Sequence, residues 1–180
     1  QKKFENSTHY LKPKIQFNFS PTNGKDISSD TVRLSYGNLF SSNRIGRSDM
    51  VEEGKSMTLG LEFEKHNLSN EKLLGFYVGN VLKDKKNNSM PSRAKLDQTR
   101  SDIVGNIFYN PSENIKFDYN FSYDRDLNFS NYDAIAAKFG ENNFVSTFNY
   151  ITENHELGDS EIIKNDTKLK FNNDHSILFN

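Results

Sequence analysis

The chain has 180 residues, a formal net charge of −1 and no cysteine. This charge gives no general attraction to nucleic acid or acidic lipid, and the lack of cysteine excludes disulfides, thiol catalysis and cysteine-ligated zinc. Only 34% of the residues are hydrophobic, yet 13% are aromatic. Because disordered chains are poor in aromatic residues, this composition favours a fold with one apolar and one polar face.

The chain shows no helical membrane anchor and no targeting signal. No stretch approaches the roughly 18 apolar residues of a membrane-crossing helix, and the opening Gln1-Lys2-Lys3-Phe4 does not resemble a signal peptide. The chain does not begin with Met. We therefore expect an internal fragment of a longer protein.

The first third of the chain combines one strand with one long loop. Ile15, Phe17 and Phe19 alternate with polar residues, which predicts a strand. Residues 20–54 are expected to form a long irregular loop, with a short strand near 31–37.

Alternating patterns continue through the middle of the chain. They predict strands at 55–65 and 72–82, joined by the short link 65–71, followed by a polar loop at 83–99 and a strand at 100–110. The segment 101–109 is apolar on both faces, so its orientation stays open.

The clearest alternation lies within the expected strand 114–124, where every odd position from 115 to 123 is apolar or aromatic and every even one is polar. Side chains two residues apart share one face of a strand. We assign one set to lipid, namely Ile115, Phe117, Tyr119, Phe121 and Tyr123. We assign the other to the lumen of a barrel, namely Lys116, Asp118, Asn120 and Ser122.

The last third continues the meander. A tight link at 125–126 leads to a weaker strand at 127–139, of which 133–139 could be a helical turn. A strand at 143–153, one ending near Phe171, and a partial one at 175–180 follow. Eight full-length strands result, and most match the roughly 9–11 residues of a tilted bilayer-crossing strand.

Connections tend to alternate between long and short, with 125–126 as the exception. This arrangement is typical of an up-and-down outer-membrane barrel. We therefore predict an all-β, antiparallel up-and-down meander that forms a partial wall of a transmembrane barrel, with residues 1–180 in one domain. Because a bilayer does not tolerate unpaired strand edges, either the eight strands close on themselves or further strands exist.

The polar residues form no catalytic or metal-ligating constellation. The four histidines are isolated, and the loop that starts at Asp124 lacks the Gly and Glu of a calcium-binding EF-hand. We therefore expect no catalytic, cofactor or metal site and no enzyme activity. The lysines at 83–86 are either a solvated charge run or a contact for phosphates.

The most specific motif lies at residues 38–52. The residues are Asn38-Leu39-Phe40, then Asn43-Arg44 and Asp49, followed by the strand Met57-Thr58-Leu59-Gly60-Leu61-Glu62. Upstream, Tyr10-Leu11-Lys12-Pro13 opens a strand that ends at Ser20-Pro21. This order of motifs resembles the LptD family of lipopolysaccharide-assembly proteins, and the resemblance in strand order covers essentially the whole chain.

The resemblance implies a translocon component in the outer membrane of a Gram-negative bacterium that inserts lipopolysaccharide into the outer leaflet. It also implies an LptE-like plug lipoprotein and an LptA-like periplasmic bridge as partners, and no nucleic acid. The chain would be part of the C-terminal barrel. The alternatives are another outer-membrane barrel, such as a porin, or a soluble β-sandwich binding module, which the low mean hydropathy leaves open.

Overall fold

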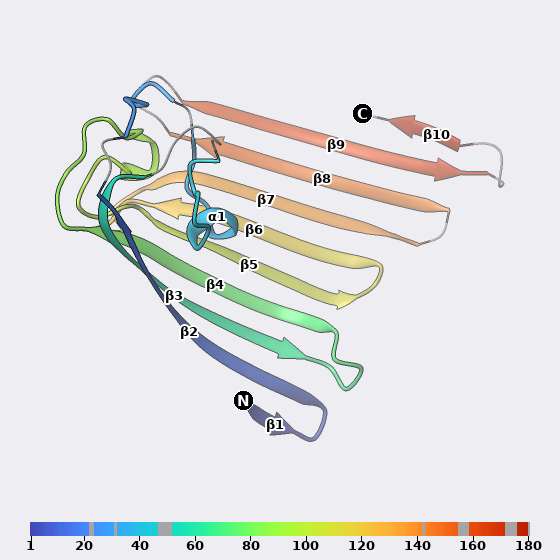
Figure 1. Cartoon of the computed structure of the whole chain (residues 1–180). Coiled ribbons are helices and arrows are strands. Elements are labelled where there is room, and N and C mark those ends of the chain that lie inside the picture. The colour runs from blue at the N-terminus through green and yellow to red at the C-terminus, as the bar shows by residue number, and fades with distance from the viewer. Residues whose placement is uncertain are drawn as a thin grey trace.

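The computed structural model describes residues 1–21, 24–30, 32–46, 52–141, 143–154, 159–171 and 176–179. Within these residues the chain forms one ten-stranded antiparallel sheet in which each strand pairs with the next along the chain (Figure 1). The strands are β1 (Lys2–Phe4), β2 (Ser7–Ser20), β3 (Gly54–His66), β4 (Lys72–Lys83), β5 (Ile103–Ser112), β6 (Ile115–Tyr123), β7 (Ser130–Glu141), β8 (Phe144–Glu153), β9 (Ser160–Lys170) and β10 (Ser176–Phe179).

The predicted all-β meander is therefore confirmed. The sheet is not closed, which is consistent with a partial barrel wall, and its outermost strands are the short β1 and β10. The described chain builds one layer and not the two layers of a sandwich, so the β-sandwich alternative is wrong.

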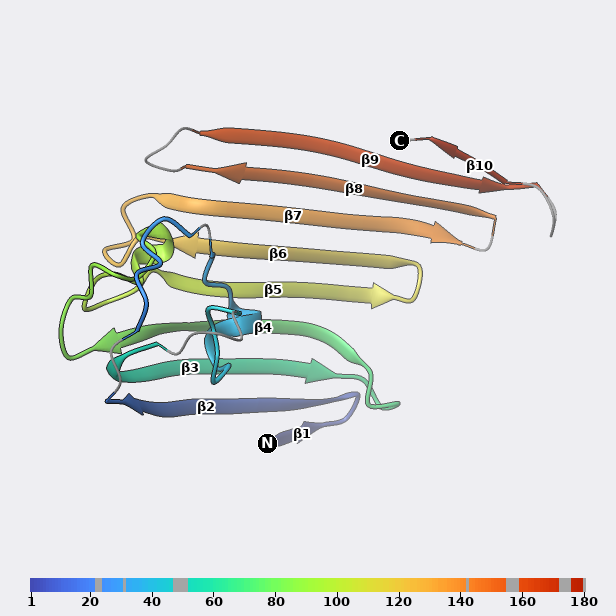
Figure 2. The same ribbon diagram turned by 45° about the horizontal axis from the view of Figure 1, so that its top comes forward.

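The connections sort by side, as Figures 1 and 2 show. At one end, which we call the loop end, lie the connections 21–53, 84–102, 124–129 and 154–159. At the other, the turn end, lie the shorter connections 5–6, 67–71 and 113–114. Asp124 shapes one of the loop-end connections, since its Oδ1 accepts the Asn128 N–H at 2.6 Å. The expected tight link at 125–126 is therefore wrong, and the exception to the alternation disappears.

Two local predictions fail. Residues 133–139 lie inside the continuous strand β7, because Tyr132 through Glu141 pair with β8 and cannot form a helical turn. The short strand expected near 31–37 is absent from the described residues of that segment, where α1 (Tyr36–Leu39) begins instead. The Asn38 side chain accepts the Ser35 N–H at 2.8 Å, and this local bond favours a helical turn over an extended chain. β1 is a strand that sequence patterns did not indicate.

The described part of the β2–β3 loop (residues 21–53) folds back over one face of the sheet, and both views place α1 against that face (Figures 1 and 2). The hydrophobic core lies here, between the sheet and the loop-end connections. It contains Ile27, Leu34, Leu39, Ile45, Val81, Met90, Leu96 and Val104. The connection between β4 and β5, residues 84–102, contains a short 3-10 helix, η1 (Arg93–Lys95). In the described part of the chain, no helix has the length and apolarity that crossing a membrane requires.

Candidate functional site

The sheet has two chemically different faces. The register sets Phe117 of β6 beside Tyr109 of β5 and Ala137 of β7, and these side chains share what we call the apolar face. Large hydrophobic side chains on this face stay exposed, for example Phe17 at 76% and Ile163 at 64%. An exposed apolar area that spans several strands indicates contact with lipid or another apolar partner.

The opposite, polar face carries the other set of β6 side chains. Asn120 lies opposite Asn106, and Asp118 lies opposite Phe108. The Asn106 amide donates to Asp118 at 3.0 Å and to Asn120 at 3.1 Å. The residues assigned to lipid and those assigned to the lumen thus lie on opposite faces, while their contact with lipid and water stays a prediction.

The motif residue Asn38 ties the β2–β3 loop together. Its Nδ2 donates to the Arg33 carbonyl at 2.9 Å and to the Arg44 carbonyl at 3.4 Å. One amide therefore links the chain before α1 to the chain after it. An apolar side chain could not donate these hydrogen bonds. This explains why position 38 is polar although Leu39 and Phe40, which follow it, are apolar.

Leu39 and Phe40 insert into hollows that glycines leave in the sheet. A Cβ atom at Gly79 would lie 2.6 Å from Leu39 Cδ2, and one at Gly60 would lie 2.6 Å from Phe40 Cζ. Leu39 is fully buried. The loop motif and the Gly-containing strands β3 and β4 are thus two sides of one interface, and glycine is required there by close approach.

Arg44 anchors the loop through charge. It is 2% exposed, and its Nε lies 2.6 Å from Glu52 Oε2. Its other nitrogens donate to Thr58 and Ser56 of β3, each at 3.2 Å. Burial lowers the pKa of Arg44, whereas the Glu52 carboxylate opposes that effect, and a guanidinium stays charged in either case.

Glu52 extends this network to the next connection. Its Oε1 lies 2.8 Å from Lys83 Nζ, and Lys83 also donates to the Leu96 carbonyl at 2.6 Å. The side chains of Glu52 and Lys83 are 9% and 5% exposed. Buried pairs of this kind are costly to break, so they fix both connections on the polar face.

The remaining motif residues are less constrained. Asn43 is exposed, and its Oδ1 accepts the Gly46 N–H at 3.1 Å, which closes a turn. Gly46 has a φ of 74°, a conformation that favours glycine. Asp49 lies outside the described residues.

A polar network covers the face of β2–β4 below the loop. Glu64 accepts hydrogen bonds from Lys12 at 3.0 Å, Lys72 at 2.7 Å and Tyr77 at 2.6 Å. Tyr77 stacks on Tyr36 of α1 with ring centroids 5.3 Å apart. Two lysines and one tyrosine thus converge on the Glu64 carboxylate, and these bonds tie β2, β3 and β4 together.

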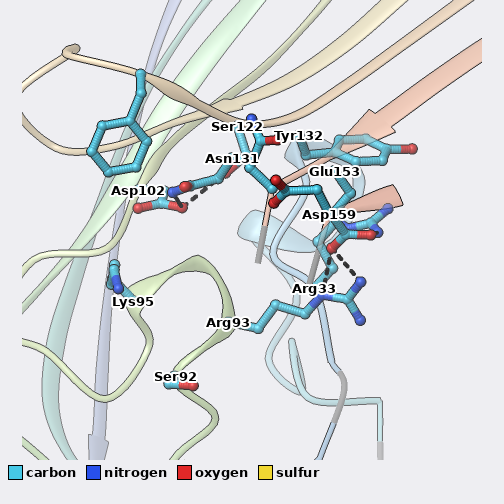
Figure 3. Close-up of a pocket in the computed structure, with 12 residues that line it drawn as sticks. Arg33, Ser92, Arg93, Lys95, Asp102, Ser122, Asn131, Tyr132, Glu153 and Asp159 are labelled. Carbon is cyan, nitrogen blue, oxygen red and sulfur yellow. Dashed lines mark hydrogen bonds and ion pairs between the residues drawn. The ribbon is translucent and has the colours of Figure 1, made fainter. Parts of the chain in front are cut away.

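A cavity of about 370 Å³ lies at the loop end between η1 and strands β7 and β8 (Figure 3). Glu153 stands at its wall and binds both Arg33 and Arg93, with 2.7 Å between Arg93 Nε and Glu153 Oε1. The Arg33 guanidinium also lies 3.7 Å from the Tyr132 ring centroid. Three segments far apart in the chain are thereby joined at one carboxylate.

Asp102 lies in the same cavity wall (Figure 3). It is fully buried and accepts hydrogen bonds from Asn131 at 2.7 Å and Ser122 at 3.1 Å. Burial raises the pKa of Asp102, although these hydrogen bonds oppose the rise. Its second oxygen has no hydrogen-bond partner among the described residues.

Sequence patterns did not identify the Glu52, Arg33, Arg93 and Glu153 side chains as functional. They placed Lys83 in a solvated charge run or a phosphate contact, whereas its side chain is 5% exposed and paired with Glu52. Arg33 and Glu153 are 120 residues apart, so no local spacing could link them. The described residues contain no group of three or more His, Cys, Asp or Glu side chains that could hold a metal ion.

A meander of long antiparallel strands with one apolar face, one polar face and loops sorted to one end is the wall of an outer-membrane β-barrel. A family model, LptD, described as LPS transport system D, matches residues 1–172. The chain therefore belongs to the LptD family. No protein of curated function matches it.

Membership places the chain in the outer membrane of a Gram-negative bacterium and in lipopolysaccharide transport, together with other components of that machinery. The family is one of transport and assembly proteins. The porin alternative is set aside by this match.

Proposed function

We propose that residues 1–180 form part of one transmembrane β-barrel that inserts lipopolysaccharide into the outer leaflet. The observation that carries the proposal is the LptD match over residues 1–172. The two-faced sheet supports it, because an amphipathic lipid needs a polar path for its sugars beside an apolar surface for its acyl chains.

The lipid-facing and lumen-facing assignments belong to this proposal. Ile115, Phe117, Tyr119, Phe121 and Tyr123 would contact the bilayer, and Lys116, Asp118, Asn120 and Ser122 would contact water and the passing sugar. Moving such a lipid requires a wall, a polar lumen and an external source of work. No nucleophile or general base is needed, which agrees with a non-enzymatic role.

Two partners are also part of the proposal: an LptE-like lipoprotein that plugs the barrel and an LptA-like bridge that delivers the lipid. The β2–β3 loop already occupies the polar face of β3 and β4. A plug would therefore meet the remaining polar face, on β6–β9.

The function is tested by depleting the full-length protein and following newly made lipopolysaccharide. We expect less of it to become accessible to a lipopolysaccharide-modifying enzyme added outside the cell. Surface arrival at the normal rate in depleted cells would contradict the proposal.

The wall assignment is tested separately, since the chain has no native cysteine. Single cysteines are placed at positions 115–123 of the full-length protein and treated with lipid-soluble or water-soluble thiol reagents in native membranes. We expect odd positions to react with the former and even positions with the latter. Odd positions inert to both reagents would indicate a dry protein interface.

A further inference from the structure

A second cavity, of about 330 Å³, opens near the turn end of the polar face. Its lining includes Lys72, Phe108, Asn110, Lys116, Asp118 and Lys138, which come from β4, β5, β6 and β7. Three ammonium groups thus border one hollow together with one carboxylate, one amide and the two aromatic rings of Phe108 and Phe117. This composition suits an anionic ligand with polar and apolar parts.

Lys116 and Lys138 are directly opposite each other in the pairing of β6 with β7. Like charges opposite each other in an antiparallel pair destabilise it. Neither lysine forms an ion pair or side-chain hydrogen bond with any residue that the structure describes. The sheet therefore carries an uncompensated positive pair at this point.

Of the two acidic groups nearby, Glu64 is paired with a lysine, whereas Asp118 accepts a neutral amide that does not compensate its charge. Asp118 accepts the Asn106 amide at 3.0 Å, and Glu64 holds Lys72 at 2.7 Å. Lys72 is therefore paired with a carboxylate of the protein, whereas the described residues offer no ion pair to Lys116 or Lys138. Asp118 is the one carboxylate in the described lining against these two lysines, so the hollow keeps an excess of positive charge that an external anion would compensate.

The cavity at the loop end differs in this respect. There both guanidinium groups, of Arg33 and Arg93, bind Glu153. The positive charges of that cavity are therefore compensated within the protein, and its ion pairs join two loops to β8. In the cavity beside Lys116 and Lys138, Glu64 binds Lys72, but no carboxylate of the described residues is bound to Lys116 or Lys138.

We propose that the cavity lined by Lys116, Lys138 and Lys72 binds a phosphate group of the transported glycolipid. This inference rests on the proposed function and specifies a subsite within it. The short turns of outer-membrane barrels lie on the periplasmic side. The site would therefore hold the phosphate where lipid arrives, and Phe108 beside it offers an apolar surface.

The test uses the full-length protein in detergent, with a photoreactive p-benzoylphenylalanine in place of Asn110, which lines the cavity. The probes are mixed micelles of that detergent and phosphatidylcholine that contain bisphosphorylated lipid A or the same lipid without phosphates. We expect Lys116→Gln with Lys138→Gln to lower cross-linking to lipid A about tenfold or more, because charge-assisted hydrogen bonds to phosphate are lost. The double variant with Arg at both positions should retain it.

The matched control is Lys164→Gln, a lysine already paired with Asp166 at 2.9 Å. It should leave cross-linking unchanged. Equal cross-linking by the double Gln variant, or by the phosphate-free lipid, would overturn the inference. Competition by inorganic phosphate at low millimolar concentration would instead assign the site to free phosphate and overturn the lipid assignment.

The two failures are distinguishable. If the wild-type cavity cross-links lipid without help from the lysines, the phosphate site is wrong and the transport function stands. If depletion of the protein leaves lipopolysaccharide delivery intact, the proposed function itself fails.

Discussion

The two halves of the sheet share one alternation pattern but use their polar faces differently. On β2–β4 the charged side chains are compensated, as in the pairs of Lys12 with Glu64 and of Lys14 with Glu62, and the β2–β3 loop covers part of that face. On β8 and β9 no residue is buried, and on β6 and β7 Lys116 and Lys138 face each other. The polar face of β2–β4 thus binds a loop of the same chain. The polar face of β6–β9 is available to a ligand or partner near the turn end.

This difference shows that alternation alone does not define a lumen. The polar face of β3 and β4 includes Gly60 and Gly79, which exist to admit Phe40 and Leu39. At the loop end the same face becomes apolar, with Val81 and Val104 in the core. The β6–β9 half is covered only at its loop end among the described residues, where Arg33 and Arg93 reach Glu153 of β8, and toward the turn end its polar groups stay accessible.

The largest expected effect comes from removing the buried charge that anchors the covered half. Arg44→Met should lower the free energy of unfolding by about 3–5 kcal/mol, because the Glu52 carboxylate, only 9% exposed, then loses a cationic partner. The measurement is the urea unfolding midpoint of the full-length protein in detergent. Arg125→Met, whose side chain is 51% exposed, should change it by less than about 0.5 kcal/mol. Equal changes would mean that the anchor adds nothing.

The second effect separates the faces within the open half. Phe117→Arg should cost about 2–4 kcal/mol if the side chain lies near the bilayer midplane. Asp118→Arg, on the polar face, should cost far less. Refolding into lipid vesicles measures both values, and similar costs would refute the lipid-facing assignment.

The third effect tests the close packing of the β2–β3 loop against glycines of the covered half. Gly60→Ala should cost about 1–3 kcal/mol, because its methyl group would lie 2.6 Å from the Phe40 ring. Phe40→Leu should recover part of that loss in the double variant. Gly37→Ala meets only Ser35 Oγ, at 3.7 Å, and is the control. Additive losses for Gly60 and Phe40 would show that the two residues do not interact.

The smallest effect is a pH dependence at the junction of the two halves. Because burial raises the pKa of Asp102, the folded state binds its proton more tightly than the unfolded state does. The contribution of Asp102 to stability should therefore fall as pH rises from the ordinary Asp pKa through the raised one. Asp102→Asn should remove this slope from unfolding midpoints measured across that range. An unchanged slope would assign the pH dependence to other groups.

The strands could be predicted because alternation is a local property, and residues 115–123 display it without interruption. The packing of the β2–β3 loop on the sheet could not be predicted, since Leu39 and Gly79 are distant in sequence and neither residue type indicates its partner. The motif identified Asn38, Leu39, Phe40 and Arg44, but not that the last three contact β3 and β4. The strand expected near 31–37 failed because a short side-chain bond from Asn38 outweighs weak alternation.

The inward position of the β2–β3 loop also sets an order of assembly. Leu39 packs against Gly79 of β4, and Lys83 of β4 pairs with Glu52 of the loop. The β2–β3 hairpin alone therefore cannot fix the loop in place, and β4 must pair with β3 first. Arg44, Glu52 and Lys83 must leave water together, which makes the step cooperative. The strands β2–β4 and their loop would then fold as one unit. The later strands would add to a barrel wall whose lumen the β2–β3 loop already narrows at the loop end.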